Sequence, residues 1–182
     1  MQRKSCALVF LVLLLSCPKC LYAQDSASNF QRLLEQNSLQ FSMPPDFWAV
    51  RVHSNPDVAY DFAMCSTVMK LEIRYRICPI TQAGRVYDAM LVAMALNISG
   101  GQMIQPKKYR NPDVKLEFGA DAGCSGMVRT NSPFGHDYQY CMISAIHKEG
   151  IADVYAFFLF DDPKDVMEAV SSTKVYHALR FR

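Results

Sequence analysis

The sequence lacks the local patterns that mark common metal and catalytic sites. Its four histidines are far apart, and its one C-x-x-C pair joins Cys17 and Cys20 near the N-terminus. Structural zinc is held by four ligands that usually come in such local pairs. No serine stands in G-x-S-x-G, the turn that exposes a hydrolase nucleophile. The sequence therefore predicts no metal site, no cofactor and no catalytic residue.

Long apolar runs are also scarce. The longest is Ala7–Leu15, nine residues preceded by Arg3 and Lys4, whereas a bilayer span needs about 20 residues. A short apolar core behind positive charge is typical of a signal peptide, which is cut after a small residue such as Ala23. We therefore expect residues 1–23 to be a signal peptide and the protein to be exported, either to a periplasm or out of the cell.

A second mode of cleavage stays open. Residues 14–17, Leu-Leu-Ser-Cys, resemble the bacterial lipobox, in which Cys17 would be acylated and would anchor the protein to a membrane. Pro18 is awkward beside a modified N-terminus, and this cleavage would leave Cys20 as a fifth thiol. Cleavage after Ala23 leaves four cysteines, an even number that suits an oxidising compartment. We favour ordinary cleavage.

The sequence also has no large excess of positive or negative charge. The chain has 19 Lys and Arg and 17 Asp and Glu. Residues 1–23 hold three of the basic residues and no acidic one, so 16 against 17 remain and the mature net charge is −1. A near-neutral chain gives no global attraction to nucleic acid or to anionic membrane. We expect no nucleic-acid partner, and membrane contact only through Cys17.

The remaining residues have the size of one domain. Residues 24–36 read as a polar leader or short helix, and residues 37–182 as a single α+β domain. Strand 68–78 alternates apolar side chains with Lys70, Glu72, Arg74 and Arg76, the period of a strand with one wet face. Strands 138–147 and 152–160 are apolar on both faces, which is typical of the middle of a sheet covered on both sides.

Two helices are predicted to supply that cover. Residues 89–96 are eight apolar residues rich in Ala, Leu and Met, which predicts a deeply buried helix. Asp162 can cap a second helix that has Pro163 at its first position. The expected fold is an antiparallel β-sheet covered by helices on both faces, an α-β-α sandwich.

The order of these segments resembles a known superfamily. The order begins with an early Pro-Asp-Phe-Trp turn (residues 45–48), which is followed by the strand "KLEIRYRI" and a long helix. After these come the loop "EFGADAG" and a terminal helix before "ALRF". This order, over about residues 37–182, is similar to the PsbP-like α-β-α sandwich. The resemblance implies a non-catalytic scaffold that binds partners, and it transfers no site residue.

The four mature cysteines allow one pairing argument. Cys124 and Cys141 flank the turn signal at residues 131–135, and a hairpin centred there would bring them opposite one another, close enough for a disulfide. Cys65 and Cys78 are interpreted as two buried thiols.

Two loops carry candidate binding residues. The first loop places three basic side chains around a tyrosine between prolines, where they could bind an acidic partner. The other places an aromatic and a histidine at a hairpin tip. The candidate binding residues are Lys107, Lys108, Tyr109, Arg110, Phe134 and His136.

The functional hypothesis is an exported bacterial cell-envelope protein that binds a protein partner or a small ligand. The alternative is an envelope enzyme that uses Cys124 or His136. A carrier with a pocket beneath the helix, near Met90, Met94 and Met103, is a third possibility.

The first prediction concerns processing. The intact mass of the protein purified from its native cell should equal residues 24–182, because cleavage after Ala23 removes the leader. A mass that begins at Cys17 and includes acyl chains would contradict this and establish the lipoprotein alternative.

Overall fold

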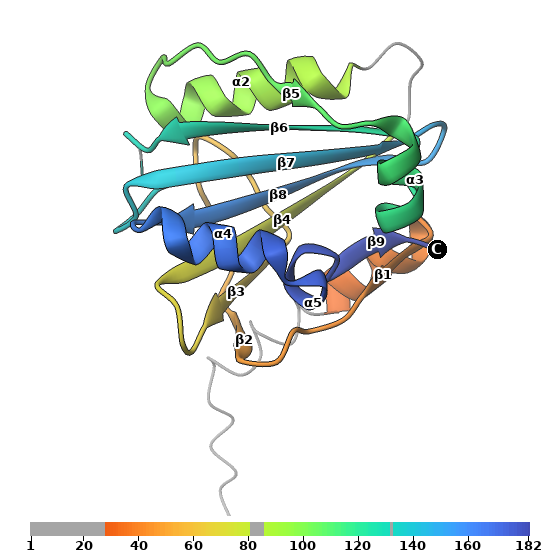
Figure 1. Ribbon diagram of the computed structural model, residues 1–182, viewed down its shortest axis with the longest axis horizontal. Coiled ribbons are helices and arrows are strands. Elements are labelled where there is room, and N and C mark those ends of the chain that lie inside the picture. The colour runs from red at the N-terminus through yellow and green to blue at the C-terminus, as the bar shows by residue number, and fades with distance from the viewer. Residues whose placement is uncertain (1–27, 81–85, 132) are drawn as a thin grey trace, which may run out of the picture.

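Seven antiparallel strands form the main sheet, in the order β2-β3-β4-β8-β7-β6-β5 (Figure 1). The structure is a computed structural model that describes residues 28–80, 86–131 and 133–182. The predicted signal peptide and Cys17 lie outside the described residues. The strands of this sheet are β2 (Phe47–Val50), β3 (Phe62–Ser66), β4 (Leu71–Pro79), β5 (Lys107–Lys108), β6 (Ala122–Arg129), β7 (Tyr140–Lys148) and β8 (Ala152–Phe160).

Two short strands and five helices complete the described part of the chain. Strand β1 (Leu39–Phe41) pairs with β9 (Leu179–Phe181), so the first and last strands meet in a separate two-stranded sheet. The helices are residues 28–36, α2 (Tyr87–Ser99), α3 (Asn111–Phe118), α4 (Pro163–Ser171) and α5 (Thr173–Tyr176). Among the described residues, no helix has the length and apolarity needed to cross a membrane.

The predicted α+β fold with a large antiparallel sheet is confirmed. The two strands that were expected in the middle, β7 and β8, pair with one another and have β6 and β4 on their outer sides. Every residue of β8 except Ala156 is buried. A strand can be apolar on both sides only where both sides are covered, which explains this central place.

The buried side chains form one cluster on each face of the sheet. Val154 and Phe158 of β8 belong to the first cluster, together with side chains of α3, α4, α5 and helix 28–36. Tyr155 and Phe157 belong to the second, together with side chains of α2. We call the face of the sheet that carries the first cluster the α4 face, and the face that carries the second cluster the α2 face (Figure 1).

The predicted helices form where they were expected, but α2 is less buried than predicted. Its buried residues lie along one side, namely Leu91, Met94, Ala95, Ile98 and Ser99, whereas Ala89, Ala93 and Asn97 are exposed. The outer side of the helix also carries mainly small apolar side chains, so its composition alone predicted burial on all sides. At α4 the prediction is confirmed in detail, because the Asp162 side chain accepts a hydrogen bond of 2.9 Å from the Lys164 backbone.

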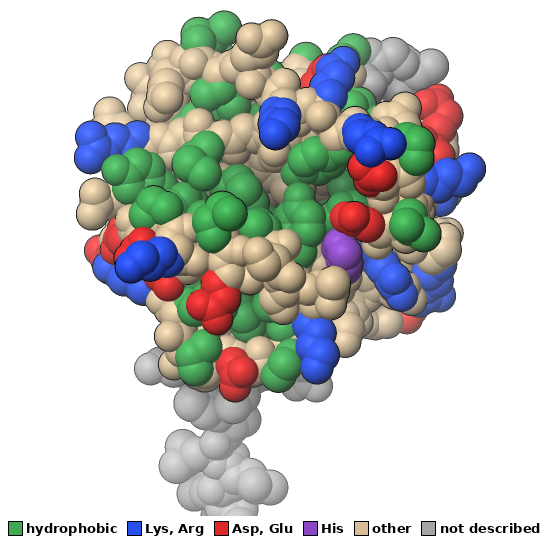
Figure 2. Space-filling model, viewed as in Figure 1, with side chains coloured by type: hydrophobic (Ala, Val, Ile, Leu, Met, Phe, Trp, Pro, Cys, Tyr) green, Lys and Arg blue, Asp and Glu red, His purple; other side chains and the backbone are tan. Residues whose placement is uncertain are grey.

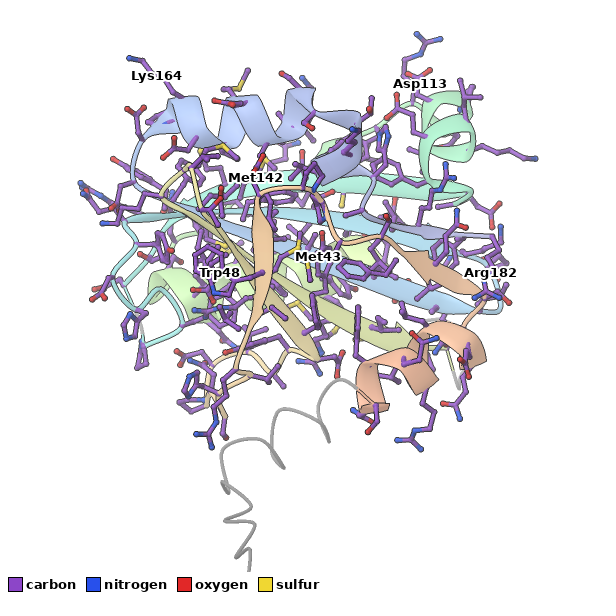
Figure 3. All side chains as sticks on the ribbon, turned by 90° about the horizontal axis from the view of Figure 1, so that it is seen from below. Met43, Trp48, Asp113, Met142, Lys164 and Arg182 are labelled. Carbon is purple, nitrogen blue, oxygen red and sulfur yellow. The ribbon has the colours of Figure 1, made fainter. Side chains whose placement is uncertain are left out.

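The cover of the α4 face is incomplete over β6 and β7. Figure 2 shows hydrophobic side chains gathered there, on the left of the view and above α4. Met142 of β7 lies on this side of the sheet, beside α4 (Figure 3). The opposite side of the same strands is better covered, because Cys124, Val128 and Cys141 are at 1% exposure or less.

The predicted disulfide between Cys124 and Cys141 is wrong. In the β6–β7 register Cys124 lies opposite Ala145 and Cys141 opposite Val128, four residues or about 13 Å apart along the ladder. A disulfide needs Cα atoms within about 7 Å. The hairpin turn is longer than the turn signal suggested, because Thr130 pairs with Gln139 across it. The described cysteines, all free, are Cys65, Cys78, Cys124 and Cys141.

The supposed wet face of β4 is covered at Glu72 and Arg74, which the alternating pattern did not reveal. The side chains of Arg74 and Glu72 are only 7% and 14% exposed, and Arg74 Nε lies 2.6 Å from Glu72 Oε1. Arg74 Nη1 donates to the Phe134 carbonyl at 2.5 Å. Its guanidinium lies 4.9 Å from the Tyr60 ring centroid and 4.7 Å from that of Phe134. Arg74 thus holds two loops, which contain Tyr60 and Phe134, onto the α2 face.

The second prediction tests this buried cation. Arg74→Met should lower the free energy of unfolding by about 3–5 kcal/mol, because it leaves the Glu72 carboxylate buried without its partner. Urea unfolding followed by circular dichroism measures the loss. Arg76→Met, on the same face of the same strand but half-buried, is the matched control and should cost about 1 kcal/mol. Equal losses in the two variants would show that Arg74 is no anchor.

Candidate functional site

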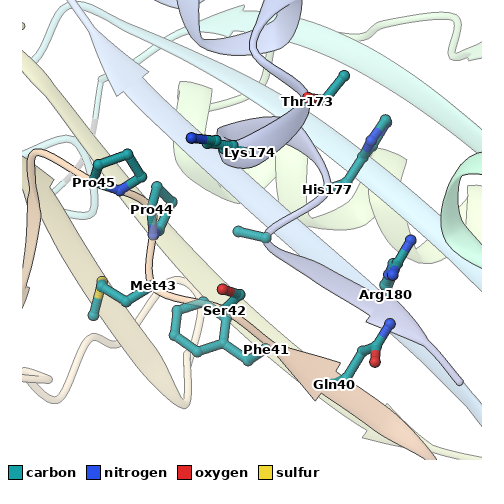
Figure 4. Close-up of a pocket in the computed structure, with 11 residues that line it drawn as sticks. Gln40, Phe41, Ser42, Met43, Pro44, Pro45, Thr173, Lys174, His177 and Arg180 are labelled. Carbon is teal, nitrogen blue, oxygen red and sulfur yellow. The ribbon is translucent and has the colours of Figure 1, made fainter.

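A groove of about 610 Å³ lies between the segment that follows β1 and the end of the chain around α5 and β9 (Figure 4). We call it the basic groove. One wall is Gln40, Phe41, Ser42, Met43, Pro44 and Pro45, and the other is Thr173, Lys174, His177, Ala178 and Arg180.

Strand pairing brings these walls together from opposite ends of the sequence. Gln40 lies opposite Arg180 in the β1–β9 ladder, and Ser42 N donates to the Ala178 carbonyl at 2.9 Å. Leu39 and Leu179 are buried beneath this ladder. The alternation of the strands therefore turns Gln40 and Arg180 outward, toward the groove.

The first wall is held away from the main sheet by its local sequence. Pro44 and Pro45 cannot donate to a ladder, so the chain leaves β1 without continuing as a strand. Asp46 then adopts a left-handed conformation with φ of 63°. Its carbonyl accepts a hydrogen bond of 2.7 Å from Thr67 N, which fixes the turn into β2.

The second wall consists of the single helical turn α5 and the segment that leads from it into β9. Val175 of α5 is buried in the α4 face, so Thr173, Lys174 and His177 are left toward solvent and the groove. His177 Nε2 lies 3.2 Å from Glu117 Oε2 of α3. The Phe118 ring meets the His177 ring edge-on, with centroids 4.8 Å apart. These contacts fix the imidazole at the end of the groove.

The electrostatics of the groove are one-sided. Lys174, His177 and Arg180 line it, and no Asp or Glu does. Lys174 and Arg180 form no ion pair with any other described residue. The Gln40 amide, turned so that its oxygen faces Arg180, accepts from it at 2.5 and 3.0 Å. Two exposed cations beside hydroxyl groups can bind a carboxylate or a phosphate.

Sequence reasoning missed these residues. Lys174, His177 and Arg180 stand in a stretch that reads only as a helix end and a closing strand. Their partner wall lies some 130 residues earlier in the chain. A fixed motif could not have revealed the groove, because only the β1–β9 pairing joins its walls.

The structure separates the four residues of the predicted basic loop. Lys107 and Lys108 form edge strand β5 and pair with Ser125 and Cys124, so their side chains point to opposite faces of the sheet. Tyr109 turns inward, and its hydroxyl lies 2.8 Å from that of Tyr176 and 3.1 Å from Ser144 Oγ. Arg110 is exposed, and its Nε lies 3.7 Å from Asp113 Oδ2.

The hairpin tip is also divided. Phe134 was expected to be an exposed recognition aromatic, but it is 0% exposed and packs against Phe157 and Tyr60. The expectation is wrong because the hydrogen bond from Arg74 to the Phe134 carbonyl holds Phe134, including its ring, against the sheet. His136 is exposed, with Nδ1 2.9 Å from Asp137 Oδ2.

The other sequence candidates form no evident site. Cys124 is fully buried, and burial raises the pKa of its thiol to about 12. Met94 is buried and Met103 is exposed, so they do not share one pocket wall. In the part of the chain that the structure describes, no three His, Cys, Asp or Glu side chains are grouped so that they could hold a metal ion.

A separate polar cluster lies where the β7–β8 hairpin begins. His147 Nδ1 is 2.7 Å from Oδ1 of the fully buried Asp153, and Nε2 is 3.1 Å from Glu149 Oε2. The Tyr87 ring of α2 stacks on the imidazole at a centroid distance of 5.2 Å. Burial opposes a charge on the ring, but the hydrogen bonds to Asp153 and Glu149 outweigh it and raise the pKa of His147.

The third prediction follows from this raised pKa. A group whose pKa is higher in the folded state stabilises the fold below its unfolded pKa, near 6.5, and loses that effect as the pH rises through the folded pKa. The free energy of unfolding lost in His147→Gln should therefore be larger at pH 5.5 than at pH 9, as measured by urea unfolding. His136→Gln, at an exposed ring, is the control. An equal loss at both pH values would contradict the prediction.

Comparisons with known proteins do not assign this chain. No protein-family model, no curated protein and no solved structure matches it. The resemblance to the PsbP-like superfamily is thus neither supported nor contradicted, and it stays a prediction. The function has to be inferred from the arrangement of the residues described above.

Proposed function

We propose that this protein is exported to the bacterial cell envelope, acts there by binding rather than by catalysis, and holds the anionic group of its ligand or partner in the basic groove. Export is supported by the signal-peptide pattern of residues 1–23. The observation that carries the binding function is the set of three basic side chains, with no acidic one, around a groove of about 610 Å³.

The groove favours an anion that also has an apolar part. Lys174 extends from α5 toward the proline segment, so its ammonium lies across the opening from the apolar wall (Figure 4). That wall includes Met43, which is 39% exposed, and the rings of Pro44 and Pro45. A ligand of this class would place its carboxylate or phosphate near Lys174 and Arg180 and its apolar part against the prolines.

The architecture that we infer for this function is an α-β-α sandwich of the PsbP-like kind. The two buried clusters support it, because helices contribute side chains to both faces of one sheet. The resemblance implies that a scaffold of this kind binds partners and is not catalytic. The basic groove is lined by residues of the extra β1–β9 pair and of α5, outside the seven-stranded sheet.

The enzyme alternative finds less support. A nucleophilic cysteine is partly exposed and has a lowered pKa, whereas Cys124 is buried and burial raises its pKa. His136 lies at an exposed loop tip, where its imidazole contacts the Asp137 carboxylate rather than a nucleophile. Neither residue lines the basic groove.

The fourth prediction tests the groove with hexyl phosphate, a probe that joins an anion to an apolar chain. Titration of the full chain should shift backbone amide signals of residues 40–43 and 173–180. Lys174→Ala and Arg180→Ala should each raise the dissociation constant about tenfold, because each removes a charge-assisted hydrogen bond. Inorganic phosphate should bind more weakly than hexyl phosphate, since it lacks the apolar contact.

Lys164→Ala is the matched control. It removes an exposed cation from α4 that does not line the groove, so the affinity for hexyl phosphate should not change. If the Lys174→Ala/Arg180→Ala double variant binds the probe as tightly as the unaltered protein, the groove is not the anion site.

A further inference from the structure

The incompletely covered part of the α4 face forms a defined apolar surface. Met127 of β6 lies directly opposite Met142 of β7, and Arg129 opposite Tyr140. Met127 is 48% exposed, and Tyr140 and Met142 are half-buried. A groove of about 430 Å³ runs along Met127 and Tyr140 at this edge of the sheet. We call Met127, Tyr140 and Met142 the methionine face; hydrophobic side chains gather over these strands in Figure 2.

The charges beside the methionine face are basic and have no acidic partner. The Arg129 guanidinium lies 5.7 Å from the Tyr140 ring centroid. Lys107 pairs with Ser125 in the β5–β6 ladder and is exposed, so it points to the same side as Met127. Neither cation forms an ion pair with another described residue. Lys108, on the other side of β5, is paired with Asp88 at 3.3 Å.

We propose that the methionine face docks an amphipathic helix of a partner protein, with acidic residues beside the apolar stripe of that helix. Methionine and tyrosine side chains adapt well to a partner surface. The carboxylates would complete the ion pairs that Arg129 and Lys107 lack. This docking is independent of the anion proposed for the basic groove.

A helix fits this position better than an added strand. On the opposite side of β6 and β7 the cover is itself a helix, α2. On the methionine side, α4 already packs on the neighbouring strand β8, so a second helix beside it would extend the same layer. At the outer edge of β6 the backbone N–H of Arg129 is already used, because it donates to the Gln102 side chain at 3.3 Å. That contact opposes addition of a strand.

A second copy of this chain fits less well. A two-fold interface places the same surface of each copy against the other, so Arg129 and Lys107 of both copies would meet without an acidic partner. Their spacing instead indicates the pattern of the helix. Ser125 and Arg129 are four residues apart on β6, or about 13 Å. Acidic residues on one face of a helix recur every seven positions, or about 10.5 Å, and the long Arg129 and Lys107 side chains can span the difference.

The fifth prediction uses a synthetic 18-residue peptide with a leucine stripe and glutamates seven residues apart. The full chain, labelled with ¹³C at its methionine methyl groups, contains ten methionines. On titration we expect the signals of Met127 and Met142, identified by Met→Leu variants, to shift. Arg129→Glu should raise the dissociation constant at least tenfold, and Lys107→Glu at least threefold, because each reverses a charge that the glutamates meet.

Three controls separate this docking from non-specific binding. Leu116→Lys changes an apolar side chain of α3 that is 84% exposed, and it should leave the affinity within twofold. A peptide of the same composition in scrambled order should bind at least tenfold more weakly. The Lys174→Ala/Arg180→Ala variant should bind the peptide normally, so failure of the groove and failure of the methionine face are distinguishable.

Several outcomes would overturn the proposal. One is peptide binding that Arg129→Glu does not weaken, in a variant whose unfolding midpoint shows that it folds. Another is a shift of Met127 and Met142 by phosphatidylglycerol vesicles but not by the peptide, which would assign the face to lipid. A third is a dimer in sedimentation velocity that Met127→Lys dissociates, which would assign it to a second copy.

Discussion

The architecture depends on the need to cover strand β8 on both of its faces. Side chains of β8 alternate between the two buried clusters, and eight of its nine residues are buried. A central strand of this kind cannot fold against solvent, so each face requires its own cover. Helix α2 supplies part of one cover, and α4, α5 and helix 28–36 supply part of the other. The remaining cover on the α2 face comes from loops.

The buried arginine of β4 is a consequence of that loop cover. Loops bring backbone carbonyls over the sheet, and buried carbonyls need donors. Arg74 provides such a donor to Phe134, and its charge is balanced by Glu72 at 2.6 Å. The Tyr60 and Phe134 rings pack against the guanidinium, and little of the ion pair is exposed to solvent. A side chain that reads as part of a soluble surface thereby fixes the position of two loops.

Both proposed binding surfaces lie where this cover ends. The basic groove opens between the β1–β9 pair and α5, and the methionine face lies beyond α4. At each place two cations have no acidic partner within the described chain, Lys174 and Arg180 in the groove and Lys107 and Arg129 beside the methionine face, whereas Lys108, Arg74 and Lys70 are paired. A near-neutral protein can therefore carry two locally basic surfaces, because its acidic residues are used elsewhere. A binding protein with two such surfaces could join an anionic ligand to a partner.

The sequence by itself determined the α+β class, the central place of β7 and β8, the helix α4 with its Asp162 cap and the strand β4. These features follow from periodicity, capping and composition, which act over a few residues. Tertiary structure alone decided that Cys124 and Cys141 stay apart, that Phe134 and Arg74 are buried, and that Gln40 meets Arg180. Each of these outcomes depends on strand register or on contacts between distant segments. A local pattern carries no information on such pairings, because their free energy is realised only when the whole sheet has formed.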